Sequence, residues 1–228
     1  MALDEESKAV QEVAKTAGKA VDAAREAGGF IAKFVAGPLE QGMGIFEDRL
    51  RYMRWERQVR LMRRAEELLA QLGMSAPSRS VPLNIAIPLI QAGSLEEDDA
   101  MQDRWAALLV NAADASFPAE IQRAYVSILE QITPLEARIL DTIYALFFDE
   151  TQHAGVLTEN LPDMARVKND NETEFVMPSE VVVLALSNLV RVGCLRAGMT
   201  WGGGESYSRV NPTVLGRAFV HACQRREA

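Results

Sequence analysis

The chain has 228 residues, a formal net charge of −8, 48% hydrophobic residues and 25% charged residues. These are ordinary globular values, and the length suits one large domain or two small ones. The two cysteines lie far apart, which excludes a disulfide framework. The first ten residues are charged and lead into no apolar signal core, so a cytoplasmic location is expected. Residues 28–46 are too often interrupted by charges and proline to form a membrane span.

The N-terminal region predicts one weak helix and one short apolar segment. Small apolar residues recur at helical spacing over 5–27, and Gly28 and Gly29 end this amphipathic helix. The apolar segment 30–36 follows and is broken by Gly37 and Pro38. We name four of its side chains as a candidate membrane or partner segment: Phe30, Ile31, Phe34 and Val35.

A long helix is predicted over 39–72, with Gly73 as its stop. It carries seven arginines in RLRYMRWERQVRLMRR, residues 49–64. At 100° per residue, Leu50, Leu61, Leu68 and Leu72 fall on one line. The candidate surface for an anionic partner is the exposed flank beside that line: Arg49, Arg60, Arg63 and Arg64.

Two arginines of this helix, Arg54 and Arg57, fall close to the apolar line. A guanidinium there must reach solvent or meet a carboxylate, because an unpaired buried charge is costly. The candidate partners are nearby acidic side chains and the acidic start of the following domain. The nearby ones are Glu47, Asp48 and Glu56.

The central region predicts three helices after a linker at 73–82. The first covers 83–93, with a kink or restart at Pro88. Ser94 and Glu97 are spaced as a capping box for the second helix, which runs on to Ala112. The acidic run Glu96, Glu97, Asp98 and Asp99 suits the first turn of that helix. The third helix is expected to begin at Pro118 and run to Ile132.

The C-terminal region changes character. Thr133 and Glu136 form a second capping box, and the polar stretch 149–177 holds one short helix or strand. A helix over 179–192 stops at Gly193 and precedes a strand, a glycine-rich turn, a strand and a closing helix. This layout is typical of a winged helix, and its hairpin is the only β structure predicted.

The predicted fold class is therefore mainly α. Long N-terminal helices and a helical bundle precede a C-terminal winged-helix-like module with a small β-hairpin. The predicted domains are an N-terminal arm at 1–78, a central bundle at 79–132 and the winged-helix-like domain at 133–228.

The sequence offers no catalytic constellation. His153 lies in the polar stretch and His221 in the closing helix, and we assign a zinc site to neither; no phosphate-binding loop or nucleophile elbow occurs. Capping and the helix dipole account for the acidic run better than a cation does. We therefore assign no catalytic residue, no metal ligand and no cofactor, and we expect the protein not to be an enzyme.

The basic helix leaves four interpretations open: ion pairs or solvated charge, a protein-partner surface, an anionic membrane surface, or nucleic acid. A DNA-reading helix needs exposed polar side chains, and the helix at 179–192 offers Glu180, Ser187, Asn188 and Arg191 among many apolar residues. Acidic residues outnumber basic ones over 133–228. This balance favours a winged helix used for packing or protein contact over a DNA reader.

Several stretches together resemble the abortive-infection alpha (Abi-alpha) family of bacteria. They are GGFIAKFVAGPLEQGMGIFEDRLRYMRWERQVRLMRRAEELL, LIQAGSLEEDDAMQDRWAALLVNAAD, ITPLEARIL, LVRVGCLR and NPTVLGRAFVHAC. The resemblance implies bacterial defence, in which a phage-infected cell stops growing or dies before phage mature. It implies no catalytic residue.

The leading hypothesis is a non-enzymatic anti-phage protein that acts by binding or by disturbing a membrane surface through residues 1–64. One alternative is a winged-helix regulator that binds nucleic acid, and another is a homo-oligomeric scaffold. A protein partner or a second copy is the favoured partner, an anionic membrane surface is possible, and nucleic acid is less favoured. The expected location is the cytoplasm, with the inner membrane surface as a peripheral site.

Overall fold

The computed structural model describes residues 29, 34, 55–169 and 175–225. The chain is mostly helical and forms two compact units. Unit 1 comprises Met1–Glu120 with Arg225–Ala228, and unit 2 comprises Ile121–Gln224. Compact units do not by themselves show which segments fold alone, so the three-part division at 78 and 132 stays a prediction. The helix expected over 5–27 lies outside the described residues.

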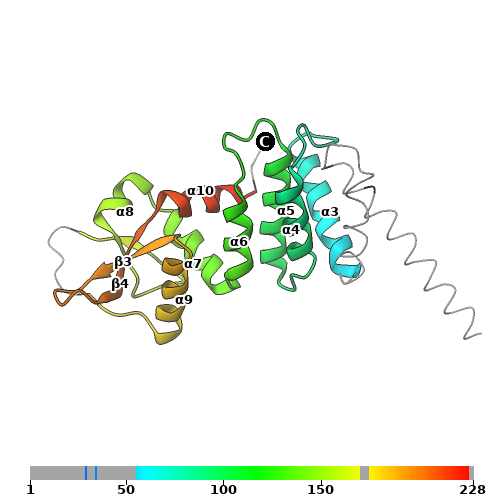
Figure 1. Ribbon diagram of the computed structural model, residues 1–228. Helices are drawn as coiled ribbons and strands as arrows, with labels where there is room; N and C mark the ends of the chain where they lie inside the picture. The colour runs from blue at the N-terminus through cyan, green and yellow to red at the C-terminus, as the bar shows by residue number, and fades with distance from the viewer. Residues whose placement is uncertain (1–28, 30–33, 35–54, 170–174, 226–228) are drawn as a thin grey trace, which may run out of the picture. The chain divides into compact units, whose positions relative to one another are not determined.

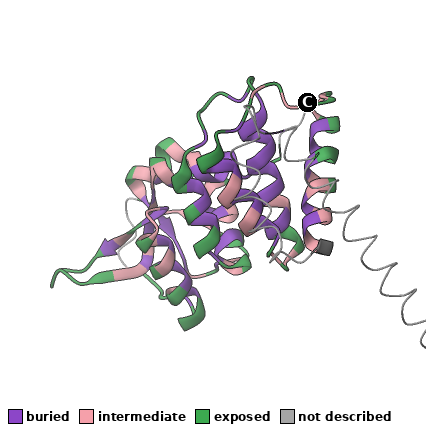
Figure 2. Cartoon of the chain, turned by 45° about the vertical axis from the view of Figure 1, so that its right-hand side comes forward, coloured by how far each residue is buried: buried purple, intermediate pink, exposed green. Residues whose placement is uncertain are grey.

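Unit 1 is built around one central helix. Helix α5 (Asp99–Ala113) is buried along almost its whole length, as a helix at the centre of a core must be. It packs against α3 (Trp55–Gln71) and α4 (Leu83–Gly93), which lie beside it (Figures 1 and 2). Leu61 and Leu68 of α3 are buried, which confirms that this part of the predicted line of leucines faces the core. Leu72 is half-buried, and Leu50 lies outside the described residues.

The residue that caps the start of α5 is not the one that the predicted capping box requires. Ser94 is buried at the end of α4, where its hydroxyl donates to Ile90 O at 2.6 Å. The N-cap of α5 is Asp98, whose carboxylate accepts from Met101 N at 2.9 Å. The prediction that Ser94 and Glu97 cap this helix is therefore wrong, because Ser94 is already used by the preceding helix.

Unit 2 begins with α6 (Arg123–Gln131), α7 (Pro134–Tyr144) and α8 (Phe148–Ala154). The prediction that a helix opens at Pro118 is wrong, since Asp114 holds the chain in a turn by accepting from Ser116 N at 2.8 Å. The capping box of α7 is confirmed: Glu136 N donates to Thr133 Oγ1 at 3.3 Å, and Glu136 accepts in return from Thr133 N.

An antiparallel sheet of four strands follows, in the order β2-β1-β4-β3. Strands β3 (Leu195–Met199) and β4 (Glu205–Pro212) form the predicted hairpin. Strands β1 (Val156–Leu157) and β2 (Arg166–Val167) come from the polar stretch. The expectation that the hairpin is the only β structure is therefore wrong. The two added strands are too short for an alternating pattern to show in the sequence.

Helices α9 (Glu180–Arg191) and α10 (Val214–Ala222) complete unit 2. Gly193, at φ +81°, ends α9 as predicted and turns the chain into β3. Thr213 Oγ1 donates to Gly193 O at 2.7 Å, and the Tyr144 hydroxyl donates to Cys194 O at 2.5 Å. These hydrogen bonds connect the start of β3 to α7 and to the first turn of α10. The likeness of this unit to a winged helix stays a prediction.

Candidate functional site

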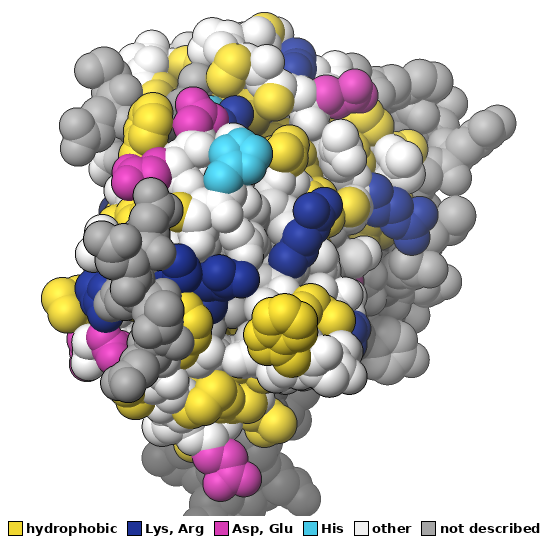
Figure 3. Space-filling view, turned by 90° about the vertical axis from the view of Figure 1, so that its left-hand side faces the viewer, with side chains coloured by type: hydrophobic (Ala, Val, Ile, Leu, Met, Phe, Trp, Pro, Cys, Tyr) yellow, Lys and Arg dark blue, Asp and Glu magenta, His cyan; other side chains and the backbone are white. Residues whose placement is uncertain are grey.

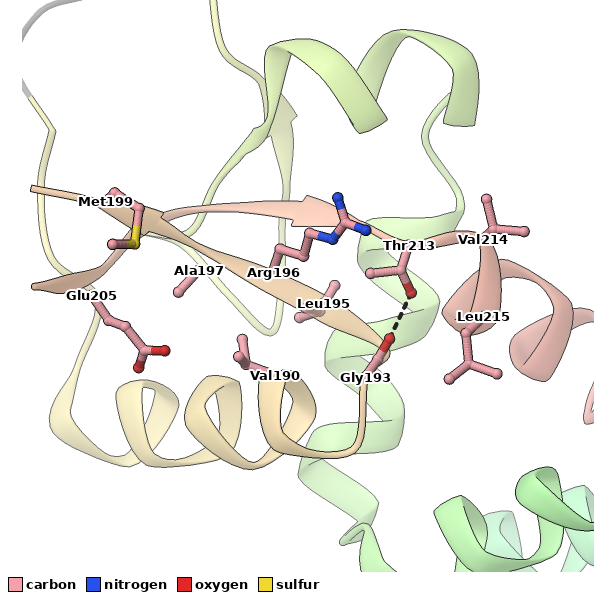
Figure 4. Close-up of a pocket in the computed structure, with 10 residues that line it drawn as sticks. All are labelled: Val190, Gly193, Leu195, Arg196, Ala197, Met199, Glu205, Thr213, Val214 and Leu215. Carbon is pink, nitrogen blue, oxygen red and sulfur yellow. Dashed lines mark hydrogen bonds between the residues drawn. The ribbon is translucent and has the colours of Figure 1, made fainter. Parts of the chain in front are cut away.

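An open groove of about 560 Å³ runs beside β3 in unit 2. Figure 4 shows its lining residues, with β3 running above α9 and the start of α10 beyond the Gly193 end of the strand. We call this hollow the β3 groove. It is lined by Val190, Gly193, Leu195, Arg196, Ala197, Met199, Glu205, Thr213, Val214 and Leu215.

Within the described residues, β3 has a hydrogen-bonded neighbour, β4, on one side only. Cys194 O accepts from Thr213 N at 3.4 Å, and Thr200 N donates to Gly204 O at 2.8 Å. Both ends of the strand thus direct main-chain groups towards the hairpin partner. The pairing shifts register between Ala197 and Gly198, but the extra residues are on β4 and none is inserted in β3. The directions therefore alternate along β3, and the main-chain groups of three residues between its ends point away from β4. Those residues are Leu195, Ala197 and Met199.

Exposed apolar side chains surround this strand edge. Met199 is 66% exposed and Val214 is 68% exposed, while Trp201 at the hairpin tip is fully exposed. Figure 3 shows one side of the molecule, where apolar side chains lie among charges of both signs. An apolar groove beside unpaired main-chain groups is suited to a peptide that adopts an extended conformation.

Charges at the groove are few and of both signs. Arg196 and Glu205 both line it and are exposed. The Tyr207 hydroxyl donates to Glu205 Oε2 at 2.6 Å, and this hydrogen bond raises the pKa of Tyr207. Cys194 lies buried at the start of β3, where burial raises the pKa of its thiol to about 12. The Cys194 thiol is therefore protonated and unreactive at neutral pH.

The polar side chains of α9 are mostly engaged inside unit 2. Asn188 Nδ2 donates to Gln131 O at 2.9 Å and to Glu136 Oε1 at 2.8 Å. Arg191 donates to Asn188 Oδ1 at 2.9 and 2.7 Å and to Gln131 Oε1 at 2.9 Å. The exposed surface of α9 instead carries Leu184. Asn188 and Arg191 are therefore poorly placed to reach base edges, which favours protein contact over DNA reading.

The arginines of α3 meet carboxylates at the start of α5. Arg57 pairs with Glu97 and donates to Leu95 O at 3.1 Å, so its partner is the predicted acidic run. Arg60 pairs with Asp99 at 2.8 Å. Arg64 bridges Asp99, at 2.9 Å, and Asp103. Asp103 also pairs with Arg225.

The predicted sites in the N-terminal half are thus only partly described. Arg63 is exposed, and no ion pair joins it to the residues that the structure describes. Phe34 is buried, and its carbonyl accepts from Val81 N at 2.8 Å. Both candidate surfaces stay predictions, because the remaining members lie outside the described residues. Those members are Phe30, Ile31, Val35 and Arg49, and Arg54 lies outside as well.

Residues 29, 34, 55–169 and 175–225, which the structure describes, contain no group of three or more His, Cys, Asp or Glu side chains placed to hold a metal ion. In the same ranges, no helix has both the length and the apolar character needed to cross a membrane.

The β3 groove is not among the sites predicted from the sequence. Its strand does carry a signal, because Leu195, Ala197 and Met199 alternate as an uncharged row. A tryptophan inside a glycine-rich turn is a second signal, since a side chain as large and apolar as that of Trp201 is normally covered. Neither pattern shows that the free edge of the sheet lies at β3, because strand order depends on long-range pairing.

Comparison with known proteins gives one match. The abortive infection alpha family matches residues 56–223, which is most of the chain. No curated protein and no solved structure matches the chain. The family match indicates a role in phage defence by abortive infection. The chain belongs to the abortive infection alpha family.

Proposed function

We propose that the protein acts in abortive infection as a non-enzymatic binding protein, with the β3 groove as its binding surface. The observation that carries this proposal is the free edge of β3 beside an open apolar groove. The ligand that fits is an extended protein segment. Its main chain would pair with β3, and its apolar side chains would cover Ala197, Met199 and Val214.

Nucleic acid is a weaker candidate for this surface. Acidic residues outnumber basic ones in unit 2, and phosphate contacts require the opposite balance. Asn188 and Arg191, the strongest base-reading candidates on α9, already form hydrogen bonds to α6 and α7.

An anionic membrane surface is the remaining rival. Arg60 and Arg64 hold carboxylates of α5, so binding lipid headgroups would require these ion pairs to separate. The proposed location is the cytoplasm, and peripheral membrane association would follow only from such a release.

Phage plating on cells that produce the protein tests the proposal. Met199→Lys places a charge on the groove edge while the hairpin is preserved, because Met199 lies opposite Glu205 across the β3–β4 pair. We expect phage plaques to be fewer on cells with the natural chain and to recover on cells with Met199→Lys.

The matched control is Met164→Lys. Met164 is 53% exposed, also lies in unit 2 and does not line the groove. Both variants should be produced at equal levels and unfold at equal temperatures. Equal protection by Met199→Lys and the natural chain would exclude the groove as the effector surface. Liposome flotation and DNA mobility shifts on the same proteins show whether a rival surface is active.

A further inference from the structure

We infer that the segment bound by β3 is β3 of a second copy of this chain, paired antiparallel about a two-fold axis at Ala197. This inference rests on the proposed use of the β3 groove for binding. It names the partner and the register, and it predicts a symmetric dimer with one continuous sheet across its interface.

The strand edge has the pattern that such pairing needs. The main-chain groups of Leu195, Ala197 and Met199 point away from β4, and Ala197 is the middle residue of this row. Rotation about Ala197 aligns Leu195 of one copy with Met199 of the other. Every outward N–H and C=O of the short strand then has a partner, whereas a shift by one residue would lose them.

Charge does not oppose this register. Leu195, Ala197 and Met199 are uncharged, and β3 carries neither lysine nor proline, the residues that commonly block a sheet edge. Its one charged residue, Arg196, falls opposite Gly198 of the second copy. The two arginines therefore avoid each other, and each guanidinium lies over a position with no side chain.

Trp201 gives the pairing an apolar anchor. Two residues beyond Met199, it comes level with Gly193 of the second copy, where Val190, Val214 and Leu215 line the groove. The fully exposed indole would be covered there, and the two-fold axis would repeat the contact. A tryptophan that becomes buried in an interface commonly supplies much of the binding free energy.

Sedimentation of the full chain over a wide concentration range tests self-association. We expect a monomer–dimer equilibrium. Met199→Lys should weaken the dimer by about tenfold or more, because it places an ammonium group against Leu195 of the second copy. Met164→Lys should leave the equilibrium unchanged.

Thiol cross-linking tests the register. Ala197→Cys puts two thiols across the axis, with Cβ atoms about 5 Å apart, so a short bismaleimide should join them. The natural cysteines, Cys194 and Cys223, are buried and should not react. The control is Val181→Cys, whose site on α9 is 65% exposed and lies off the strand edge.

Each outcome decides between the two proposals. A chain that stays monomeric at all soluble concentrations overturns the self-pairing, as does a dimer that Met199→Lys leaves intact and Ala197→Cys fails to cross-link. If defence is nevertheless lost in Met199→Lys, the groove binds a foreign segment and the proposed function survives. If Ala197→Cys cross-links the dimer, and Met199→Lys removes the dimer but not the defence, the self-pairing is upheld and the proposed function is overturned.

Discussion

Gly216 of α10 lies where no side chain fits. A methyl group there would overlap the Tyr144 hydroxyl and the carbonyl oxygen of Cys194. That hydroxyl also accepts from Thr213 N at 3.0 Å, so it is held in place. We expect Gly216→Ala to lower the free energy of unfolding by about 2 kcal/mol or more, the range found for overpacked cores. Urea denaturation followed by circular dichroism measures this change.

The control for this substitution is Gly202→Ala in the hairpin turn, where an added methyl group contacts nothing within 4 Å. Its stability should stay within about 0.5 kcal/mol of the natural chain. Equal stability of the two variants would show that α10 can shift away from α7.

At the scale of elements, we expect Arg64 to stabilise the contact between α3 and α5 more than Arg63 does. Arg64 is 20% exposed and bridges Asp99 and Asp103, whereas Arg63 is exposed. We expect Arg64→Met to lower the free energy of unfolding by about 1 kcal/mol, because two carboxylates lose a partly buried partner. Thermal and urea unfolding would measure this change, and hydrogen exchange would show whether it lies in unit 1.

Arg63→Met is the matched control, since it removes a guanidinium from the same helix. It should change stability by less than about 0.5 kcal/mol. The difference between the two variants should shrink as salt is added, because ions screen the exposed side of the Asp99 pair. If both substitutions lowered stability equally, the stabilisation would come from the overall charge of the helix and not from the ion pairs of Arg64.

At the scale of the whole molecule, we expect net charge to oppose nucleic-acid binding. The chain carries a formal charge of −8, and a DNA duplex is also negatively charged. We expect no mobility shift of duplex DNA at physiological salt. A shift that weakens with salt and disappears in Arg196→Ala with Arg209→Ala would instead establish the regulator alternative.

The capping signals show how far the sequence predicts local structure. Thr133 and Glu136 form the expected box because both partners lie within one turn, and Glu136 has one oxygen for Thr133 N and the other for Asn188. Ser94 has the same spacing to Glu97, yet its hydroxyl bonds to α4 and Glu97 pairs with Arg57 of α3. A spacing rule describes the partners that the chain offers nearby. It does not include groups that only the fold brings close.

The sequence by itself determined the mainly helical class, the ends of helices at Gly73 and Gly193, the β3–β4 hairpin and the family. The first three features depend on helical periodicity and on glycine turns, which are local, whereas the family was indicated by the resemblance of several stretches of sequence. Only the tertiary structure decided the carboxylate partners of Arg57, Arg60 and Arg64, the added strands β1 and β2, and the free edge at β3. Those features depend on which distant segments pair, and pairing is settled by the packing of the whole core.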